Sequence, residues 1–294
     1  MKKILSIFTI LAFAVLLVAC QSDLTSTTDV IESDQSTPVE PIRVGMDLRY
    51  PPFETVIDGV PTGISVDVAM AFGEFLGRPV EIVNTNFGSL IPSLNAGEID
   101  VIIASMSNTP ERAESINFSD TYFYFKIPSL VNSTYANANN LTEDSTTEDI
   151  LAVSSTKFTG ITGQISASLP ESLGLTVEIA TNLAAAVLNV VQGTSDVLMM
   201  STFPVVRGHL ANPQDTIVIW DAWISSPIAM GMRKDDTDLL AQANAFIATM
   251  SEPGGLYDVL RDKWTADNLD PADYEEAVLF VLERFGMDFF INEN

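Results

Sequence analysis

Short apolar runs alternate with helical stripes of apolar side chains along the first part of the chain. The runs have the length of strands, and the last of them is unbroken, which is typical of a strand covered on both faces. One helical stripe ends at Gly77 and the next at Gly97, and glycine suits the end of a helix. In chain order the predicted elements are a strand at 42–46, a helix at 66–76, a strand at 80–83, a helix at 90–97 and a strand at 101–104. This order predicts a parallel sheet with right-handed crossovers.

The same alternation restarts at Ile150 and predicts a second lobe. Its elements are a strand at 150–153, a helix near 163–169, a strand at 175–179, a helix at 182–192 and a strand at 197–200. The predicted fold class is therefore α/β, with two similar lobes. Ligands in such folds bind at the carboxyl ends of the strands, so a site is expected in the crevice between the lobes.

Residues 1–19 have the layout of a secretory signal peptide. Lys2 and Lys3 form a short basic region, and residues 4–19 carry no charge. The apolar run is shorter than the ~20 residues of a membrane-spanning helix. It ends in Leu-Val-Ala-Cys, which resembles the lipobox of bacterial lipoproteins and implies a lipid on Cys20 that anchors the protein to the membrane, outside the cytoplasm. The alternative is a leader that precedes a cysteine by chance.

The next segment, residues 20–40, has the composition of a disordered tether. Ser, Thr, Asp, Glu, Gln and Pro dominate it, and few apolar side chains are present to offset the entropy of ordering the backbone. The folded body is expected to start near Pro41. Its length of about 250 residues is enough for one large domain or two modest ones.

The chain is strongly acidic. It has 39 Asp and Glu residues against 14 Lys and Arg, a formal net charge of −25, and loss of the leader with its two lysines leaves −27. Such a surface repels nucleic acid and anionic lipid, so no nucleic-acid partner is expected. One cysteine excludes a disulfide within the chain, and a single histidine, His209, argues against a zinc site. Neither a metal nor a cofactor is predicted, and a monomer is expected.

The segment at 103–123 carries the clearest chemical signal. An apolar run is followed by small hydroxyl residues, a Thr-x-x-Arg step that opens a helix, and an aromatic strand. The segment offers a carboxylate the free backbone N–H groups of a helix start, hydroxyl donors and the Arg112 guanidinium. The planar guanidinium matches a carboxylate through two bonds, which a lysine cannot do. The alternative for Arg112 is a cap or an ion pair on a helix surface.

Residues 42–264 resemble the family 3 solute-binding proteins of bacterial ABC transporters, the polar amino-acid receptors. Phe-Gly-Ser-Leu-Ile-Pro-Ser-Leu at 87–94 is similar to the family's Trp-x-x-Leu-Ile-Pro-x-Leu, and Gly-Ile-Thr-Gly-Gln at 160–164 is similar to Gly-Thr-Thr-Gly-Glu. Further matches, in the family's order, lie at 47–53, 63–67, 97–100, 193–196, 255–257 and 263–264. The resemblance implies a periplasmic-binding-protein-like fold of type II, in which two α/β lobes joined by two hinge strands close on a ligand.

The resemblance also implies how the chain is divided. Lobe 1 comprises residues 41–131 and 227–268, lobe 2 comprises 132–226, and the hinge strands lie near 126–131 and 227–232. Residues 269–294 extend past the family's usual end. There Asp270 and Pro271 suit a helix start, and an apolar stripe from Tyr274 to Phe285 predicts an added helix packed on lobe 1. The alternative is a surface for the transporter or a neighbouring receptor.

For individual positions the resemblance implies a ligand site shared by the two lobes. Tyr50 supplies an aromatic wall, Ser105 and Ser107 hydrogen-bond the ligand, and Arg112 binds its carboxylate. Core packing is the alternative for Tyr50 and for Phe53. The full set of predicted ligand-binding residues is Asp47, Tyr50, Phe53, Phe87, Ser105, Ser107, Arg112, Gly160, Ile161, Thr162 and Ser201.

The lobe 2 part of this site is expected to use the backbone N–H groups of residues 160–162 at a helix start. Two of its positions depart from the family pattern. Family members usually bind the α-ammonium through an Asp at the position of Ser201, and the first Thr of the Gly-Thr-Thr step is Ile161 here. A neutral hydroxyl cannot supply a charge-assisted hydrogen bond, which is worth roughly 1.5–3 kcal/mol.

Two positions in lobe 1 also depart, because Phe87 replaces the usual Trp and Ser65 replaces an Asp. The pocket is therefore expected to be more apolar than is usual in the family. Either another acid, Glu54 or Asp47, binds the ammonium, or the ligand has no α-ammonium. The second alternative is slightly favoured, and it makes a small organic carboxylate as good a candidate as an amino acid.

The function implied by the resemblance is that of an extracytoplasmic binding lipoprotein. It captures an amino acid or small carboxylate in the cleft between the lobes and delivers it to the transmembrane subunits of an ABC permease. It is not expected to be an enzyme. The alternatives are an enzyme of the same fold, similar to cyclohexadienyl dehydratase, and a ligand-sensing receptor.

Overall fold

The computed structural model describes residues 39–162 and 164–293. The predicted signal peptide, the lipidation site at Cys20 and nearly all of the tether lie outside these residues. Within the described residues, no helix combines the length and the apolar character needed to cross a membrane. The first strand, β1 (Ile42–Met46), starts directly after Pro41.

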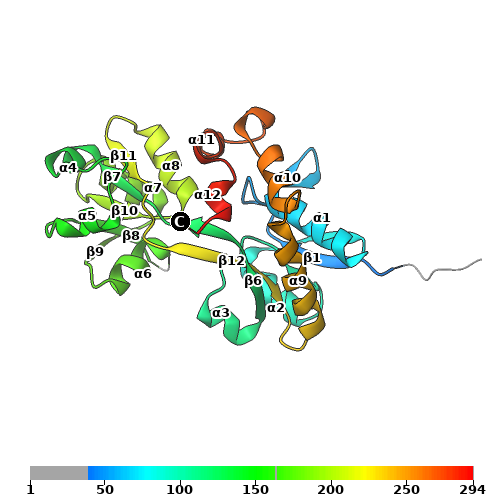
Figure 1. Cartoon of the computed structure of the whole chain (residues 1–294). Coiled ribbons are helices and arrows are strands. Elements are labelled where there is room, and N and C mark those ends of the chain that lie inside the picture. Colours follow the sequence, from blue (N-terminus) through cyan, green and yellow to red (C-terminus); the bar gives the residue numbers. More distant parts are fainter. Residues whose placement is uncertain (1–38, 163, 294) are drawn as a thin grey trace, which may run out of the picture. The chain divides into compact units, whose positions relative to one another are not determined.

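The first sheet has the strand order β4-β1-β5-β12-β6, and Figure 1 labels β1, β12 and β6 of it. Its strands are β1, β4 (Val80–Asn84), β5 (Val101–Ile102), β6 (Asn117–Lys126) and β12 (Ser225–Met232). β1 pairs in parallel with β4 and β5, whereas β12 is antiparallel to both β5 and β6. The predicted parallel pairing of the first three strands is therefore confirmed, and β12 makes the sheet mixed. The chain re-enters this sheet directly as β12, without the crossover helix that a parallel neighbour needs.

The second sheet is also mixed, with the order β11-β7-β10-β8-β9. Its strands are β7 (Ser129–Asn132), β8 (Phe158–Ile161), β9 (Val177–Ala180), β10 (Val197–Met199) and β11 (Thr216–Ile219). The chain passes between the sheets twice, from β6 to β7 and from β11 to β12. Residues 129–131 pair in the second sheet, although the sequence assigns them to the first lobe, and residues 225–226 pair in the first sheet.

Helices cover both sheets, and a short hairpin of β2 (Thr55–Ile57) and β3 (Val60–Thr62) follows β1 (Figure 1). The helices are α1 (Ile64–Leu76), α2 (Leu90–Asn95), α3 (Pro110–Ser115), α4 (Ser133–Ala138), α5 (Thr147–Ala152), α6 (Ile165–Ser172), α7 (Leu183–Val191), α8 (Thr202–Ala211), α9 (Thr237–Met250), α10 (Leu256–Lys263), α11 (Glu276–Phe285) and α12 (Asp288–Ile291), with the short 3₁₀ turns η1 (Phe87–Ser89) and η2 (Ala266–Asn268). α1 ends as predicted at Gly77, whose φ of 65° lies in the left-handed region.

The predicted strand at 150–153 is wrong, because these residues belong to α5 and the loop after it. Thr146 and Asp149 form a capping box that starts the helix, and Ile150 is fully buried while Leu151 is exposed. A run of four apolar residues does not distinguish a strand from a short helix, and here the local cap decides. The first strand of the parallel part of this sheet is β8.

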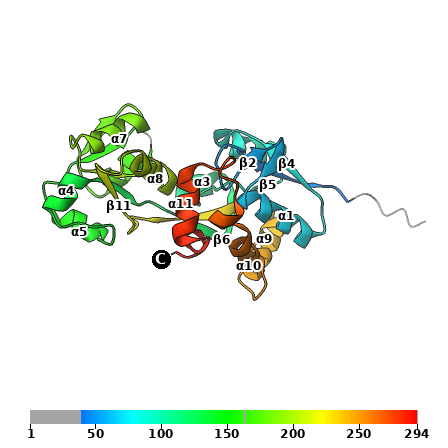
Figure 2. The ribbon, with the colours of Figure 1, turned by 90° about the horizontal axis from the view of Figure 1, so that it is seen from above.

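The C-terminal extension also differs from its prediction. Residues 270–274 form a turn around Asp270, and α11 begins only at Glu276. The apolar stripe is buried as expected, with Val278 and Val281 at 0% exposure. However, α11 lies against α8 of the second lobe and α12 lies against β6 of the first, so the extension packs on both lobes rather than on lobe 1 alone (Figure 2).

Candidate ligand-binding site

The main cavity opens at the carboxyl ends of β1 and β5, where the fold class predicts a site. It has a volume of about 470 Å³, which is the size of a small-molecule pocket. Its lining residues are Asp47, Arg49, Tyr50, Glu54, Phe87, Ala104, Ser105 and Phe125. Four of them, Asp47, Tyr50, Phe87 and Ser105, belong to the set of ligand-binding residues predicted from the sequence.

Glu54 is the acid on the floor of this cavity. It is 1% exposed, and Ser105 Oγ donates a hydrogen bond of 2.7 Å to its Oε1. Burial raises the pKa of Glu54 to about 8, against hydroxyl hydrogen bonds that favour the ionised form. Ser105 itself has a φ of 51°, which is uncommon outside glycine. The sequence indicated Glu54 only as one of two candidate acids, since its burial depends on tertiary contacts.

Asp47, the other candidate acid, is already engaged by neighbours. Both of its oxygens accept from Arg49, at 2.7 and 2.6 Å, and Oδ2 also accepts from the Phe87 N–H at 2.9 Å. The hydrogen bonds from Arg49 lead in holding the pKa of Asp47 below its usual value. Asp47 therefore stays ionised and fixes the position of Phe87. Of the two acids that line the cavity, Glu54 is the one that no arginine engages.

Aromatic rings form the walls of the cavity. Tyr50 stacks on Phe53 with ring centroids 6.0 Å apart, and it lies 6.1 Å from Phe125. Phe53 is fully buried and does not line the cavity, so it supports Tyr50 from behind. Phe87 also lines the cavity and is 37% exposed. Aromatic faces beside an acid form a favourable environment for an organic cation.

Arg112 lies next to Phe87, although it does not line the main cavity. Thr109 caps α3 by accepting from the Arg112 N–H, and the guanidinium lies 5.2 Å from the centre of the Phe87 ring. Its Nη1 donates to the Ser107 carbonyl at 3.0 Å. Among the described residues it makes no ion pair. Burial lowers the pKa of Arg112, and a bound carboxylate would offset that cost.

Two hydroxyls complete this side of the site. Ser226 Oγ on β12 donates to Ser107 Oγ at 2.8 Å, which ties the segment before α3 to one of the strands that join the lobes. Ser107 also forms an isolated bridge with Ile228 of β12. Ser107 is thus held beside Arg112, although it does not line the main cavity.

The predicted residues of the second lobe lie apart from this cavity. Gly160 and Ile161 end β8 rather than starting a helix, and the Ile161 N–H donates to Ser166 Oγ at 3.1 Å. Thr162 is the exposed residue that follows. Ser201 precedes α8 and borders a gap of about 10 Å³ that it shares with Tyr50. Among the described residues, none from the second lobe lines the main cavity.

A model of the bacterial extracellular solute-binding proteins, family 3, matches residues 42–267, which is most of the chain. The chain belongs to this family. The solved structures that resemble it confirm the expected type II periplasmic-binding-protein fold of the solute-binding protein. An ancestral cationic amino-acid solute-binding protein is 29% identical, with a TM-score of 0.57, over 76% of this chain and 95% of that one. An ancestral arginine-binding protein bound to arginine is 26% identical, with a TM-score of 0.54, over 77% and 99%.

Sequence relatives of this solute-binding protein include a probable histidine-binding protein of Campylobacter jejuni, 34% identical over 43% of this chain and 48% of that protein. The arginine-binding extracellular protein ArtP of Bacillus subtilis is 28% identical over 42% and 45%. The chain therefore spans less than half the length of these two relatives. The glutamine-binding protein GlnH of Bacillus subtilis is 26% identical over 93% of this chain and 100% of that protein. α11 and α12 lie beyond the end of the family match at residue 267.

Proposed function

We propose that this solute-binding protein captures a small carboxylate that carries a cation at its other end, with arginine and lysine as the leading candidates, and delivers it to an ABC permease. The observation that carries the proposal is the buried Glu54 carboxyl, held by Ser105 on the floor of an aromatic-walled cavity. The protein would act outside the cytoplasmic membrane, attached by a lipid on Cys20.

The two ends of such a ligand would meet opposite charges. Glu54 would receive the cationic end, because its carboxylate is the acid of the cavity with oxygens not bound by an arginine. Arg112 would receive the carboxylate over the Phe87 ring. The formal net charge of −25 would raise the local concentration of cations around the protein. Relatives named for arginine, histidine and cationic amino acids are consistent with this ligand class.

Ser201 leaves open which nitrogen of the ligand is recognised. A hydroxyl supplies no charge for an α-ammonium, so two modes are possible. In the first, Glu54 binds the α-ammonium and the side chain of the ligand lies against Tyr50 and Phe125. In the second, Glu54 binds a distal cation, and the ligand needs no α-ammonium. We adopt the second mode, because the position at which family members bind the α-ammonium carries the neutral Ser201 in this chain.

Titration calorimetry against a matched panel tests the proposal. Arginine and lysine provide the cation. Citrulline and norleucine are neutral counterparts of similar shape, and 5-guanidinopentanoate and 6-aminohexanoate lack only the α-amino group. We expect binding of at least one cationic member, at least tenfold tighter than its neutral counterpart, and little loss when the α-amino group is removed. Two results together would contradict the proposal that the ligand is cationic. They are equal affinity for citrulline and arginine, and no preference for lysine or 6-aminohexanoate over norleucine.

A catalytic role is the second candidate, because a buried carboxyl with a raised pKa also suits a general acid. A relative of known structure is an ancestral amino-acid-binding protein described as a precursor of cyclohexadienyl dehydratase, 28% identical with a TM-score of 0.55. The single histidine does not help such chemistry, since His209 on α8 contacts Thr216 and does not line the main cavity. An absorbance assay with prephenate and arogenate tests this candidate, and turnover that Glu54→Gln abolishes would favour it over binding alone.

A further inference from the structure

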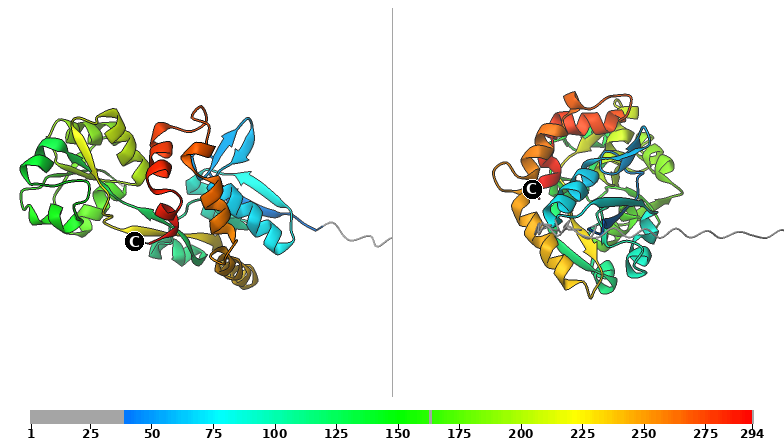
Figure 3. Two further views of the ribbon diagram at one scale, coloured as in Figure 1. Left: turned by 45° about the horizontal axis from the view of Figure 1, so that its top comes forward. Right: turned by 90° about the vertical axis from the view of Figure 1, so that its right-hand side faces the viewer.

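The C-terminal segment, residues 275–293, makes polar and aromatic contacts with the second lobe. Glu275 accepts from Arg207 of α8, with Nε and Oε2 2.8 Å apart, and Arg284 pairs with Glu143 at 3.0 Å. Trp220, directly after β11, packs against a row of three aromatic rings of the segment. These rings are Phe280, Phe285 and Phe289, with centroids 6.3, 4.6 and 6.2 Å from that of Trp220. The segment therefore has an extended contact with lobe 2 (Figure 3).

The same segment is attached to the first lobe. Asp288 accepts from Arg261 of α10 at 2.9 Å, and Lys126 at the end of β6 lies 5.1 Å from the centre of the Phe289 ring. Ser225, the first residue of β12, donates to the carbonyl of Glu293 at 2.7 Å. The segment thus contacts first-lobe residues at the ends of both strands that lead to the second lobe.

Phe290 connects the segment to the ligand site. Its ring lies 5.0 Å from Phe53 and 6.0 Å from Phe125, and Phe125 lines the main cavity. It is also 6.0 Å from Phe203 of α8, and it borders the narrow gap shared with Tyr50. Phe290 is 2% exposed. The buried ring of Phe290 therefore contacts both Phe53, which supports Tyr50 in the cavity wall, and Phe203 of the second lobe.

We propose that the C-terminal segment is a third, non-covalent link between the lobes, which holds them in the present arrangement and sets the ligand affinity. This role rests on the proposed function, together with the closure of the two lobes on a ligand that the family resemblance implies. No described residue of that lobe lines the cavity here. Closure must therefore move the lobes, and the contacts of Trp220 and Arg284 with the segment resist that movement.

The affinity follows from this link. Closure of the lobes must break the contacts between the segment and the second lobe, and this costs free energy. That cost makes ligand binding weaker than it would be in a protein that is already closed. Phe290 is a positioning residue in this scheme, because it touches neither the cavity nor a ligand but fixes Phe53 and Phe125. Weakening the second-lobe contacts of the segment should therefore tighten ligand binding.

The test compares two pairs of surface substitutions that remove equal charge. Arg207→Gln with Arg284→Gln removes the polar links of the segment to lobe 2. Arg43→Gln with Arg78→Gln is the control, because these arginines contact only residues of the first lobe. We expect Kd for the tightest ligand of the calorimetric panel to fall about threefold to tenfold in the first pair and to change less than twofold in the second. An unchanged or weaker affinity in the first pair, or an equal change in both, would overturn the inference.

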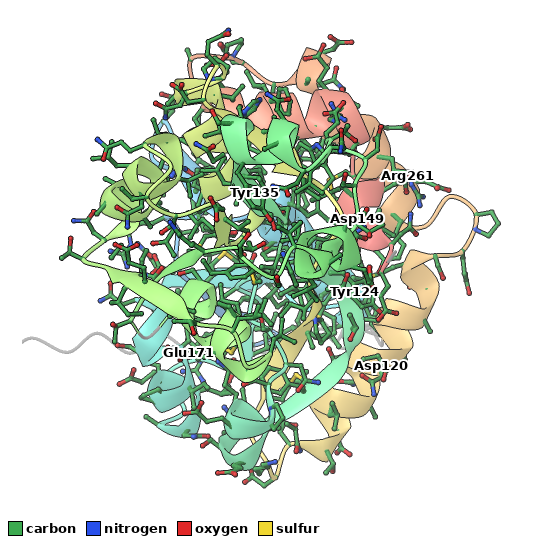
Figure 4. The ribbon with its side chains drawn as sticks, turned by 90° about the vertical axis from the view of Figure 1, so that its left-hand side faces the viewer. Asp120, Tyr124, Tyr135, Asp149, Glu171 and Arg261 are labelled. Carbon is green, nitrogen blue, oxygen red and sulfur yellow. The ribbon has the colours of Figure 1, made fainter. Side chains whose placement is uncertain are left out.

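A measurement without ligand separates this inference from the proposed function. Spin labels on Asn95→Cys in lobe 1 and Glu171→Cys in lobe 2, in a Cys20→Ser background, report the distance between lobes. Both sites are exposed, and Figure 4 shows Glu171 on the outside of the second lobe. The Arg207 and Arg284 pair should broaden or shift the distance distribution, and the control pair should not. A distance distribution that is unaltered in the Arg207→Gln, Arg284→Gln variant would overturn the proposed link, whether or not the protein binds a ligand of the panel. Failure of the wild-type protein to bind any member of the panel would count against the proposed function alone.

Discussion

The Ser105 hydroxyl donates a 2.7 Å hydrogen bond to the carboxyl of Glu54, and this pair lies on the floor of the main cavity. Ser105 comes from the loop after β5, and Glu54 comes from the loop between β1 and the β2–β3 hairpin. Two segments that are 51 residues apart in sequence thus build one acidic position. The proposed preference for a cationic ligand rests on this Glu54–Ser105 pair.

Replacing the Glu54 carboxyl by an amide should remove that preference. Glu54→Gln keeps the size of the side chain and a hydrogen-bond acceptor for Ser105, but it cannot become charged. A charge-assisted hydrogen bond is worth roughly 1.5–3 kcal/mol, so we expect the affinity for arginine or lysine to fall about 10-fold to 150-fold. Calorimetry provides the measurement, and Ser105→Ala is the matched control for loss of the supporting hydroxyl. Unaltered discrimination between arginine and citrulline in Glu54→Gln would show that the cation binds elsewhere.

The affinity for a cationic ligand should rise with pH. The pKa of Glu54 is about 8, so below that pH the carboxyl is mostly protonated and must release its proton when a cation binds. The Asp47 carboxylate contributes to the raised pKa and stays ionised throughout. Between pH 6 and 8 we expect Kd for arginine to fall by up to about tenfold per pH unit, and then to level off. Calorimetry in buffers of different ionisation enthalpy would detect the released proton, and a flat profile in the wild type would exclude ionised Glu54 as the partner.

Protein stability should have the opposite pH dependence. The folded-state pKa of Glu54 lies above its ordinary value of 4.5, so the folded state binds the proton more tightly than the unfolded state. The contribution of this group is therefore complete below about pH 4.5 and is lost as pH rises through about 8, at ~1.4 kcal/mol per pH unit at most. Urea unfolding from pH 5 to 9 should show this slope in the wild type and a smaller slope in Glu54→Gln. Identical slopes would mean that the Glu54 carboxyl is ionised in the folded protein.

Much of the first lobe could be predicted from the sequence, because local signals and burial agree there. β1 occupies the predicted range, and α1 ends at the predicted Gly77. The second lobe was harder where the signals conflict. Ile150 starts an apolar run, but the Thr146 and Asp149 cap makes it part of a helix. The parallel pairing of β1, β4 and β5 follows the prediction, whereas β12, which returns from the other lobe, pairs antiparallel and makes the first sheet mixed.

The candidate site could also be predicted only in part from the sequence. Asp47, Tyr50, Phe87 and Ser105 converge because they follow the ends of neighbouring strands, which the pattern predicts. The sequence could not predict which of the two acids, Glu54 or Asp47, is free of an arginine, because this depends on the hydrogen bonds that Arg49 donates to both oxygens of Asp47. The role of the C-terminal segment also depends on tertiary contacts. An amphipathic stripe indicates that a helix is buried but does not indicate which lobe buries it.

Arg112 provides the last test, because its guanidinium donates to the Ser107 carbonyl and lies over the Phe87 ring but forms no ion pair among the described residues. Arg112→Ala should weaken ligand binding at least 50-fold while the free energy of unfolding changes by less than about 1 kcal/mol, since the substitution breaks no buried ion pair. Arg112→Lys should recover only part of the affinity, because an ammonium cannot form the two parallel bonds of a guanidinium. Calorimetry and urea unfolding on the same preparations separate binding from stability. Wild-type affinity in Arg112→Ala would show that Arg112 does not bind the carboxylate. Arg49, whose side chain lines the main cavity, would then be the candidate, and Arg49→Gln should show the loss instead.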